Sequence, residues 1–175
     1  MTSNTVFYYV KFTENDAKDS SRQLLSRALE AFWDRTGLLP EAMSRTPEGK
    51  PYFPSGRVHL SVTHTGGLFA VCFAPFPIGL DAERVDEERK GLAERKFFPE
   101  ERSLPFSYVW CGKEAVSKLV GRGLSMMMQV KVERDRAFFA SRAFSLREEI
   151  LGEYRLVTAT EEGWSYGAET LSEKR

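Results

Sequence analysis

The chain has 175 residues, of which 42% are hydrophobic and 13% aromatic, and this predicts a globular protein with a core of its own. Its 25 basic and 25 acidic residues cancel, so the chain offers no overall field for a nucleic acid backbone or an anionic membrane surface. Residues 1–11 lack the pattern of a signal peptide, and the longest apolar run, residues 68–80, contains two prolines and is too short to span a bilayer. We therefore expect a cytoplasmic protein with neither nucleic acid nor membrane partners.

The first half of the sequence predicts a strand, a helix and then three short strands. Residues 7–12 are rich in strand formers, and Ser20 or Ser21 caps an amphipathic segment that ends at Gly37. After a loop rich in proline and glycine come the runs HLSVTH, LFAVCFA and IGLDAE, the first two joined by a Thr-Gly-Gly turn. We expect these three runs to form a small antiparallel sheet.

The second half repeats this order after a charged run at residues 83–96, which we interpret as a solvated boundary. A helical region is expected over residues 99–122. Three strand-like runs follow, MMMQVKVE, FFASRAFSL and YRLVTAT, and the methionines that open the first are expected to fill the core. The sequence therefore predicts an α+β fold of two similar halves, 1–84 and 85–175, each a helix packed on a small antiparallel three-stranded sheet.

The run WCGKEAVSKLVGRGL, residues 110–124, places charges beside an aromatic side chain. As a helix it has an apolar stripe for the core, while Glu114 and Lys118 lie on the other side, one turn apart. By itself this is an ordinary solvated ion pair that contributes about 0.3 kcal/mol. Trp110, however, lies one turn before Glu114 on the same face. A tryptophan on a face that should be wet indicates that something covers it.

The run IGLDAE places two carboxylates on one face of a strand. Asp81 and Glu83 lie about 7 Å apart along it, and they repel each other unless water or a bound cation separates them. On spacing alone, a strand end that frays into solvent beside Arg84 is the favoured interpretation. Together with Glu114, however, these residues supply three hard oxygen ligands, which suit Mg²⁺ sharing its shell with substrate phosphates.

Basic side chains near these carboxylates suit a reaction at phosphorus. Lys118 and the neighbouring Lys113 are the kind of positive groups expected where a phosphate ester is cleaved. In EGKPYF a rigid turn presents Lys50, and His64 precedes two glycines whose backbone N–H groups could face an anion. Taken singly, Lys50 is an ordinary loop residue and His64 an ordinary structural histidine.

In combination, these motifs resemble the 4′-phosphopantetheinyl transferases of the Sfp type, the larger, pseudo-dimeric class. Over residues 49–124 the chain carries, in the family's order, GKP, a strand ending in THTGG, IGLDAE, FFPEE and WCGKEAVSKLVGRGL. The resemblance implies two α+β halves related by a pseudo-two-fold axis, with coenzyme A in the cleft between them. It also implies a working monomer.

The resemblance further implies a holo-acyl-carrier-protein-synthase type of reaction. Asp81, Glu83 and Glu114 would coordinate Mg²⁺, and Glu114 would take the proton from a serine hydroxyl of an apo acyl or peptidyl carrier protein. That hydroxyl would attack the β-phosphorus of coenzyme A, the second substrate, and 3′,5′-ADP would leave.

Other residues would then contact coenzyme A. Lys118 would neutralise or protonate the leaving phosphate, with Lys113 in support. Four further residues would border the coenzyme: Thr63 and His64 at phosphate oxygens, and Lys50 and Pro51 at the adenine.

The chain also departs from the family. The segment before GKP is shorter than is usual, and four arginines remain candidates for gripping the 3′-phosphate: Arg22, Arg27, Arg35 and Arg45. The alternative function is a non-catalytic coenzyme A-binding protein with a degenerate transferase fold. Retention of Glu114 and Lys118 beside the two strand carboxylates opposes this alternative, because a pure binder needs neither a base nor an acid.

Overall fold

A computed structural model describes residues 4–13, 20–85, 89–122 and 124–172. The chain divides into two compact units: unit 1 is Met1–Pro77 with Ser165–Arg175, and unit 2 is Ile78–Trp164. Within the described residues, no helix has both the length and the apolar character needed to cross a membrane.

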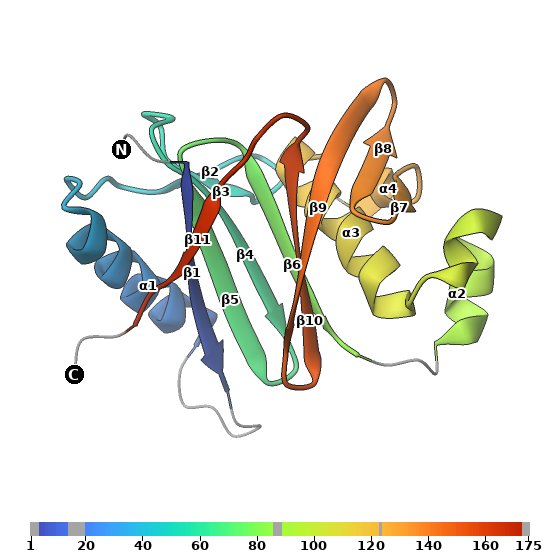
Figure 1. Cartoon of the computed structure of the whole chain (residues 1–175). Coiled ribbons are helices and arrows are strands. Elements are labelled where there is room, and N and C mark those ends of the chain that lie inside the picture. The colour runs from blue at the N-terminus through green and yellow to red at the C-terminus, as the bar shows by residue number, and fades with distance from the viewer. Residues whose placement is uncertain (1–3, 14–19, 86–88, 123, 173–175) are drawn as a thin grey trace. The chain divides into compact units, whose positions relative to one another are not determined.

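Unit 1 is a four-stranded sheet with one helix packed against it (Figure 1). The strand order is β11-β1-β5-β4; β1 and β11 pair in parallel, while the other neighbours are antiparallel. A separate two-stranded hairpin joins β2 to β3. The elements are β1 (Thr5–Phe12), α1 (Ser21–Thr36), β2 (Ser44–Arg45), β3 (Pro51–Tyr52), β4 (His59–Thr65), β5 (Leu68–Ala74) and β11 (Gly167–Thr170).

Helix α1 begins and ends where the sequence predicts. The Ser20 hydroxyl accepts from the Gln23 backbone N–H, and the Gln23 side chain accepts in turn from the Ser20 backbone, which is a capping box. Gly37 ends the helix with φ +66° and donates its N–H to the Trp33 carbonyl. From the buried face of α1, Phe32 stacks on Phe73 of β5 with ring centroids 4.5 Å apart.

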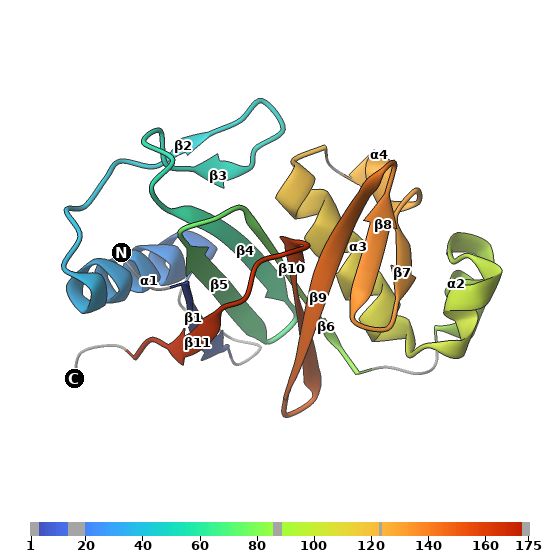
Figure 2. The same cartoon turned by 45° about the horizontal axis from the view of Figure 1, so that its top comes forward.

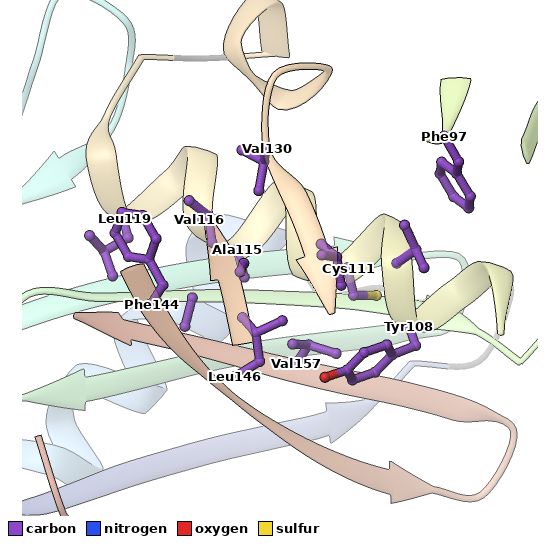
Figure 3. Packing of buried hydrophobic residues seen from close by; sticks show 14 of the residues in the cluster. Phe97, Tyr108, Cys111, Ala115, Val116, Leu119, Val130, Phe144, Leu146 and Val157 are labelled. Carbon is purple, nitrogen blue, oxygen red and sulfur yellow. The ribbon is translucent and has the colours of Figure 1, made fainter. Parts of the chain in front are cut away.

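Unit 2 is a five-stranded antiparallel sheet, β6-β10-β9-β8-β7, covered by the long helix α3 (Figure 2). Its elements are β6 (Ile78–Arg84), α2 (Lys90–Lys96), the 3-10 helix η1 (Pro99–Ser103), α3 (Phe106–Val120), α4 (Leu124–Met127), β7 (Lys131–Glu133), β8 (Arg136–Phe139), β9 (Arg142–Leu151) and β10 (Tyr154–Glu161). Figure 3 shows the core between helix and sheet, which includes Cys111, Ala115, Leu119, Phe144, Leu146 and Val157.

The α+β class is confirmed, but two details of the predicted strands are wrong. The run IGLDAE does not join the two runs before it; as β6 it pairs with β10, with Asp81 opposite Val157. Met126 and Met127 lie in α4 rather than in a strand, although both are buried as predicted, and β7 begins at Lys131. Strand partners are set by non-local contacts, which a local hydrophobic pattern does not encode.

The two sheets also differ from the predicted pair of three-stranded antiparallel sheets, because they have four and five strands and unit 1 contains a parallel pair. The compact units begin and end elsewhere than the expected halves, 1–84 and 85–175: β6 belongs to unit 2 and β11 to unit 1. The division of the chain into two functional halves at residues 84 and 85 stays a prediction.

Helix α3 and strand β6 pack backbone to backbone at Gly79. A Cβ at this position would lie 1.9 Å from the Ala115 carbonyl oxygen and 3.0 Å from the Leu119 nitrogen, so a side chain cannot be accommodated without moving the helix. Asp81 lies two residues further on the same side of β6. The glycine therefore lets the helix come close to the strand that carries the predicted metal ligands.

We predict that Gly79→Ala lowers the free energy of unfolding by about 2 to 3 kcal/mol, because the new methyl group overlaps helix backbone that can move only as a whole. Urea unfolding at equilibrium measures this. The matched control is Gly91→Ala in α2, where a Cβ meets no atom within 4 Å. An equal and small effect of both substitutions would contradict the tight contact.

Candidate functional site

The packing of α3 on β6 brings the predicted strand and helix residues of unit 2 together. Lys118 Nζ lies 2.6 Å from Asp81 Oδ1 and donates a second hydrogen bond to the Leu80 carbonyl at 3.1 Å. The Asp81 side chain is 7% exposed and that of Lys118 30%, so this pair lies at the edge of the interior, where solvent reaches only the lysine end. The lysine thus ties the helix to the strand.

Glu114 lies within the electrostatic reach of these charges. Its partial burial is the main cause that raises its pKa to about 7, and the negative charges of Asp81 and Glu83 raise it further. The ammonium of Lys118 and a hydrogen bond with the Trp110 side chain act in the opposite direction. This carboxyl group therefore holds its proton to a higher pH than an ordinary glutamate does.

Glu83 is held by basic residues of its own segment. Its Oε2 accepts from Arg89 Nη1 at 3.2 Å, and its Oε1 accepts from the Arg84 backbone N–H at 2.9 Å. The Arg89 guanidinium also lies over the Phe106 ring, 5.7 Å from its centroid. In this arrangement each strand carboxylate has a cationic side chain among its partners.

Within the described residues, no three carboxylate, imidazole or thiol groups converge in a geometry ready to hold a metal ion. The chemistry of Asp81, Glu83 and Glu114 nevertheless fits Mg²⁺, which prefers hard oxygen ligands. The raised pKa of Glu114 comes first from its burial, and the negative charges of Asp81 and Glu83 raise it further, so the three carboxyl groups are close enough to influence one another. A bound divalent cation would relieve their repulsion.

Trp110 is covered in part by the chain itself. Its ring stacks on Phe106 at a centroid distance of 5.6 Å, and Phe106 stacks in turn on Phe97 at 5.1 Å. These rings therefore provide part of the cover over Trp110 that its place in the sequence predicts. Trp110, at one end of this row of rings, lies one helical turn before Glu114 in α3.

Lys113, expected beside the leaving phosphate, has a different setting. Its side chain is fully buried, its Nζ lies 2.8 Å from Glu101 Oε1, and it donates a second hydrogen bond to the Val130 carbonyl. Burial lowers the pKa of Lys113, and the hydrogen bond and charge of Glu101 oppose that shift. These contacts favour a structural role over direct contact with a substrate.

The remaining predicted residues lie in unit 1. Lys50 directly precedes β3, and burial lowers its pKa; the pKa of His59 is lowered by burial and by the charge of Lys50, which places the two side chains near each other. Thr63 is buried while His64 is exposed. As consecutive residues of β4 these two point to opposite faces, so the structure does not bring them together.

As partners of the predicted residues, Glu101 and Arg89 in unit 2 and His59 in unit 1 are not predicted from the sequence. Glu101 is the last residue of the FFPEE motif, and its place in that motif is the signal that could have identified it. Its burial could not be predicted, because charged residues are rarely buried unless they are paired. Arg89 belongs to a charged run interpreted as a solvated boundary. His59 opens a strand, where no local pattern distinguishes it.

Comparison with known proteins matches the part of the chain that carries this geometry. The model of the 4′-phosphopantetheinyl transferase superfamily matches residues 77–166. A 4′-phosphopantetheinyl transferase of Bacillus subtilis is 29% identical over 90 residues, which cover 45% of this chain and 40% of the relative. The 4′-phosphopantetheinyl transferase ffp of Bacillus subtilis is 31% identical over 90 residues, with the same coverage.

The aligned part therefore spans 40% of the length of each of these two relatives. The region that matches the family model contains Asp81, Glu83, Glu114 and Lys118, the residues that α3 and β6 bring together. Because that region is more than half of the chain, the protein belongs to the 4′-phosphopantetheinyl transferase superfamily.

Proposed function

We propose that this protein transfers the 4′-phosphopantetheine group of coenzyme A to a serine of an apo acyl or peptidyl carrier protein, releasing 3′,5′-ADP, in a reaction that depends on Mg²⁺. One observation carries the proposal. Glu114, with its pKa raised to about 7, lies among the charges of Asp81, Glu83 and Lys118 in the segment that matches the family model.

Asp81, Glu83 and Glu114 would hold the metal, which when bound would neutralise the pyrophosphate oxygens of coenzyme A. When the metal binds, Asp81 and Glu83 would exchange their present cationic partners for the metal ion. Lys118 and Arg89 are the partners of Asp81 and Glu83 in the structure, and both are partly exposed, so either side chain can turn toward solvent or toward a phosphate group.

Glu114 then acts as the base: with the metal bound its carboxyl group would be ionised, and a carboxylate in that form can accept the proton of the serine hydroxyl. The serine oxygen forms a bond to the β-phosphorus as the bond from that phosphorus to the bridging oxygen breaks. The electron pair of the broken bond leaves with 3′,5′-ADP. Lys118 neutralises the charge that develops on this leaving phosphate.

In unit 1 we propose that Lys50, Pro51, Thr63 and His64 contact coenzyme A. The half-buried ammonium of Lys50 supports this, because its lowered pKa shows a cation that an anionic ligand would stabilise. The burial of Thr63 leaves His64 as the more accessible of the two strand residues.

We also propose the finer class. A long helix on an antiparallel sheet in unit 2, and one helix on a largely antiparallel sheet in unit 1, support assignment to the pseudo-dimeric Sfp type, with a holo-acyl-carrier-protein-synthase type of activity. Such a protein works as a monomer in the cytoplasm. A stable trimer in light scattering would contradict this class.

We predict that the protein adds one phosphopantetheine to apo carrier proteins in the presence of coenzyme A and Mg²⁺, and that EDTA abolishes the addition. Asp81→Asn and Glu114→Gln should slow it at least about 100-fold, because they remove a metal ligand and the base. Glu149→Gln on β9, an exposed carboxylate of unit 2, is the control and should transfer normally. Intact-mass spectrometry of the carrier measures each rate.

Absence of transfer to fatty acid, polyketide and peptide carriers, with coenzyme A still bound in calorimetry, would refute the catalytic proposal. It would favour the non-catalytic coenzyme A-binding protein instead. Circular dichroism of each variant separates loss of catalysis from loss of the fold.

The raised pKa of Glu114 also predicts how stability depends on pH. Its folded-state pKa of about 7 exceeds the ordinary 4.5, so the folded protein binds this proton more tightly than the unfolded chain does. The contribution is fully present below about 4.5 and is lost as the pH rises through about 7.

Glu114→Gln, which resembles the protonated form, should therefore be more stable than the parent at pH 8.5, by roughly 2 kcal/mol, and about equal to it at pH 5. Urea unfolding in metal-free buffer at the two pH values measures the difference. An equal effect at both would show that Glu114 has an ordinary pKa.

A further inference from the structure

The buried ion pair of Glu101 and Lys113 is a polar feature of unit 2 that the proposed mechanism does not use. Both side chains are 0% exposed. Glu101 Oε1 accepts from Lys113 Nζ at 2.8 Å and from the Val132 backbone N–H at 2.6 Å, while its Oε2 accepts from the Phe98 N–H at 2.8 Å. One carboxylate therefore connects three segments: η1 with the residue before it, helix α3, and strand β7.

Lys113 completes the network from the helix. Its ammonium also donates to the Val130 carbonyl, just before β7, and lies over the Phe98 ring, 4.8 Å from the centroid. The cation thus has a carboxylate, a carbonyl and an aromatic face as partners. Within α3 no other lysine or glutamate is buried to this degree.

Stability alone is a poor reason for such a pair. Burying two charges costs several kcal/mol per ion before their attraction is counted, and apolar side chains of similar volume often serve as well or better. Contacts between apolar side chains, however, are not directional, whereas hydrogen bonds are. A carboxylate that accepts hydrogen bonds from three segments fixes how those segments are oriented about one another.

The orientation that is fixed bears directly on Glu114. Lys113 and Glu114 are consecutive residues of α3, so their side chains point about 100° apart around the helix axis. With Lys113 held by Glu101, Glu114 and Lys118 are set toward β6. The backbone contact at Gly79 fixes the distance between helix and strand, and the hydrogen bonds that Lys118 donates to β6 join the same two elements, but these bonds form only when α3 is turned with this face toward β6.

We propose that Glu101 and Lys113 are positioning residues: their buried ion pair fixes the rotation of α3 and so holds Glu114 and Lys118 against Asp81. Only the effect of this positioning on catalysis rests on the proposed function. The geometric part, the register of α3 on β6, can be measured in the metal-free protein without any substrate.

The test is a double-mutant cycle of Asp81→Asn and Lys118→Met, which reports the coupling of these two side chains in urea unfolding. The cycle is measured in the parent and in Glu101→Gln/Lys113→Met, in which the buried charges are removed together so that neither is left unpaired. We expect the coupling to be present in the parent and lost in the paired variant. Coupling of equal size in both backgrounds would overturn the proposal.

The control background is Lys131→Met, which removes a lysine from an exposed pair with Glu133 on β7 and should leave the coupling intact. If the paired variant is too unstable for a full unfolding curve, Lys113→Arg takes its place, because it keeps the charge and changes its geometry. Loss of coupling there supports the positioning role, and unchanged coupling contradicts it.

Turnover provides the second readout. In the paired variant we expect kcat for carrier modification to fall about tenfold or more while KM for coenzyme A stays close to that of the parent, because misplacement of the base affects the chemical step. Normal kcat with a folded protein would contradict the inference. If the parent transfers nothing to any carrier, the proposed function fails, and the coupling in the metal-free cycle still decides the positioning role.

Discussion

The close approach of α3 to β6 at Gly79 is the constraint on which the candidate site depends. A strand and a helix normally keep a layer of side chains between them, but here the absence of a Cβ lets the helix backbone at Ala115 touch the strand. That contact places the strand carboxylate Asp81 within 2.6 Å of the Lys118 ammonium, 37 residues away in the sequence. The acidic residues of β6 and the charged residues of α3 therefore meet in one place.

Bringing these charges together creates an electrostatic imbalance, and the imbalance suits the proposed chemistry. Asp81 and Glu83 each have a basic partner, while Glu114 responds to the remaining negative charge and to its partial burial by holding its proton up to a pKa of about 7. A divalent cation that binds this carboxyl group would deprotonate it, which leaves Glu114 in the carboxylate form that a base requires. A second charged network, Glu101 with Lys113, lies on another side of α3 and is fully paired, which makes it suitable for orientation rather than reaction.

The sequence predicts the parts of this arrangement that are local. The caps of α1 follow from Ser20 and Gly37, and the shared face of Glu114 and Lys118 follows from helical periodicity. Non-local features cannot be predicted in this way. The pairing of β6 with β10, for example, depends on a strand that lies more than seventy residues later in the chain. Lys113 was expected at the leaving phosphate because it adjoins Glu114, but its burial is set by Glu101, which lies in a different segment and whose charge alone would suggest an exposed position.

The most direct test of the central claim, that α3 and β6 form a divalent-cation site around a glutamate that titrates near neutral pH, is calorimetric titration of the protein with Mg²⁺ at pH 7 in two buffers of different ionisation enthalpy. Binding should release protons, since the fraction of Glu114 that is still protonated at pH 7 must lose its proton to become a ligand. In Glu114→Gln the proton release should disappear and the affinity should fall. Binding without proton release in the parent, or release that persists in Glu114→Gln, would contradict the account.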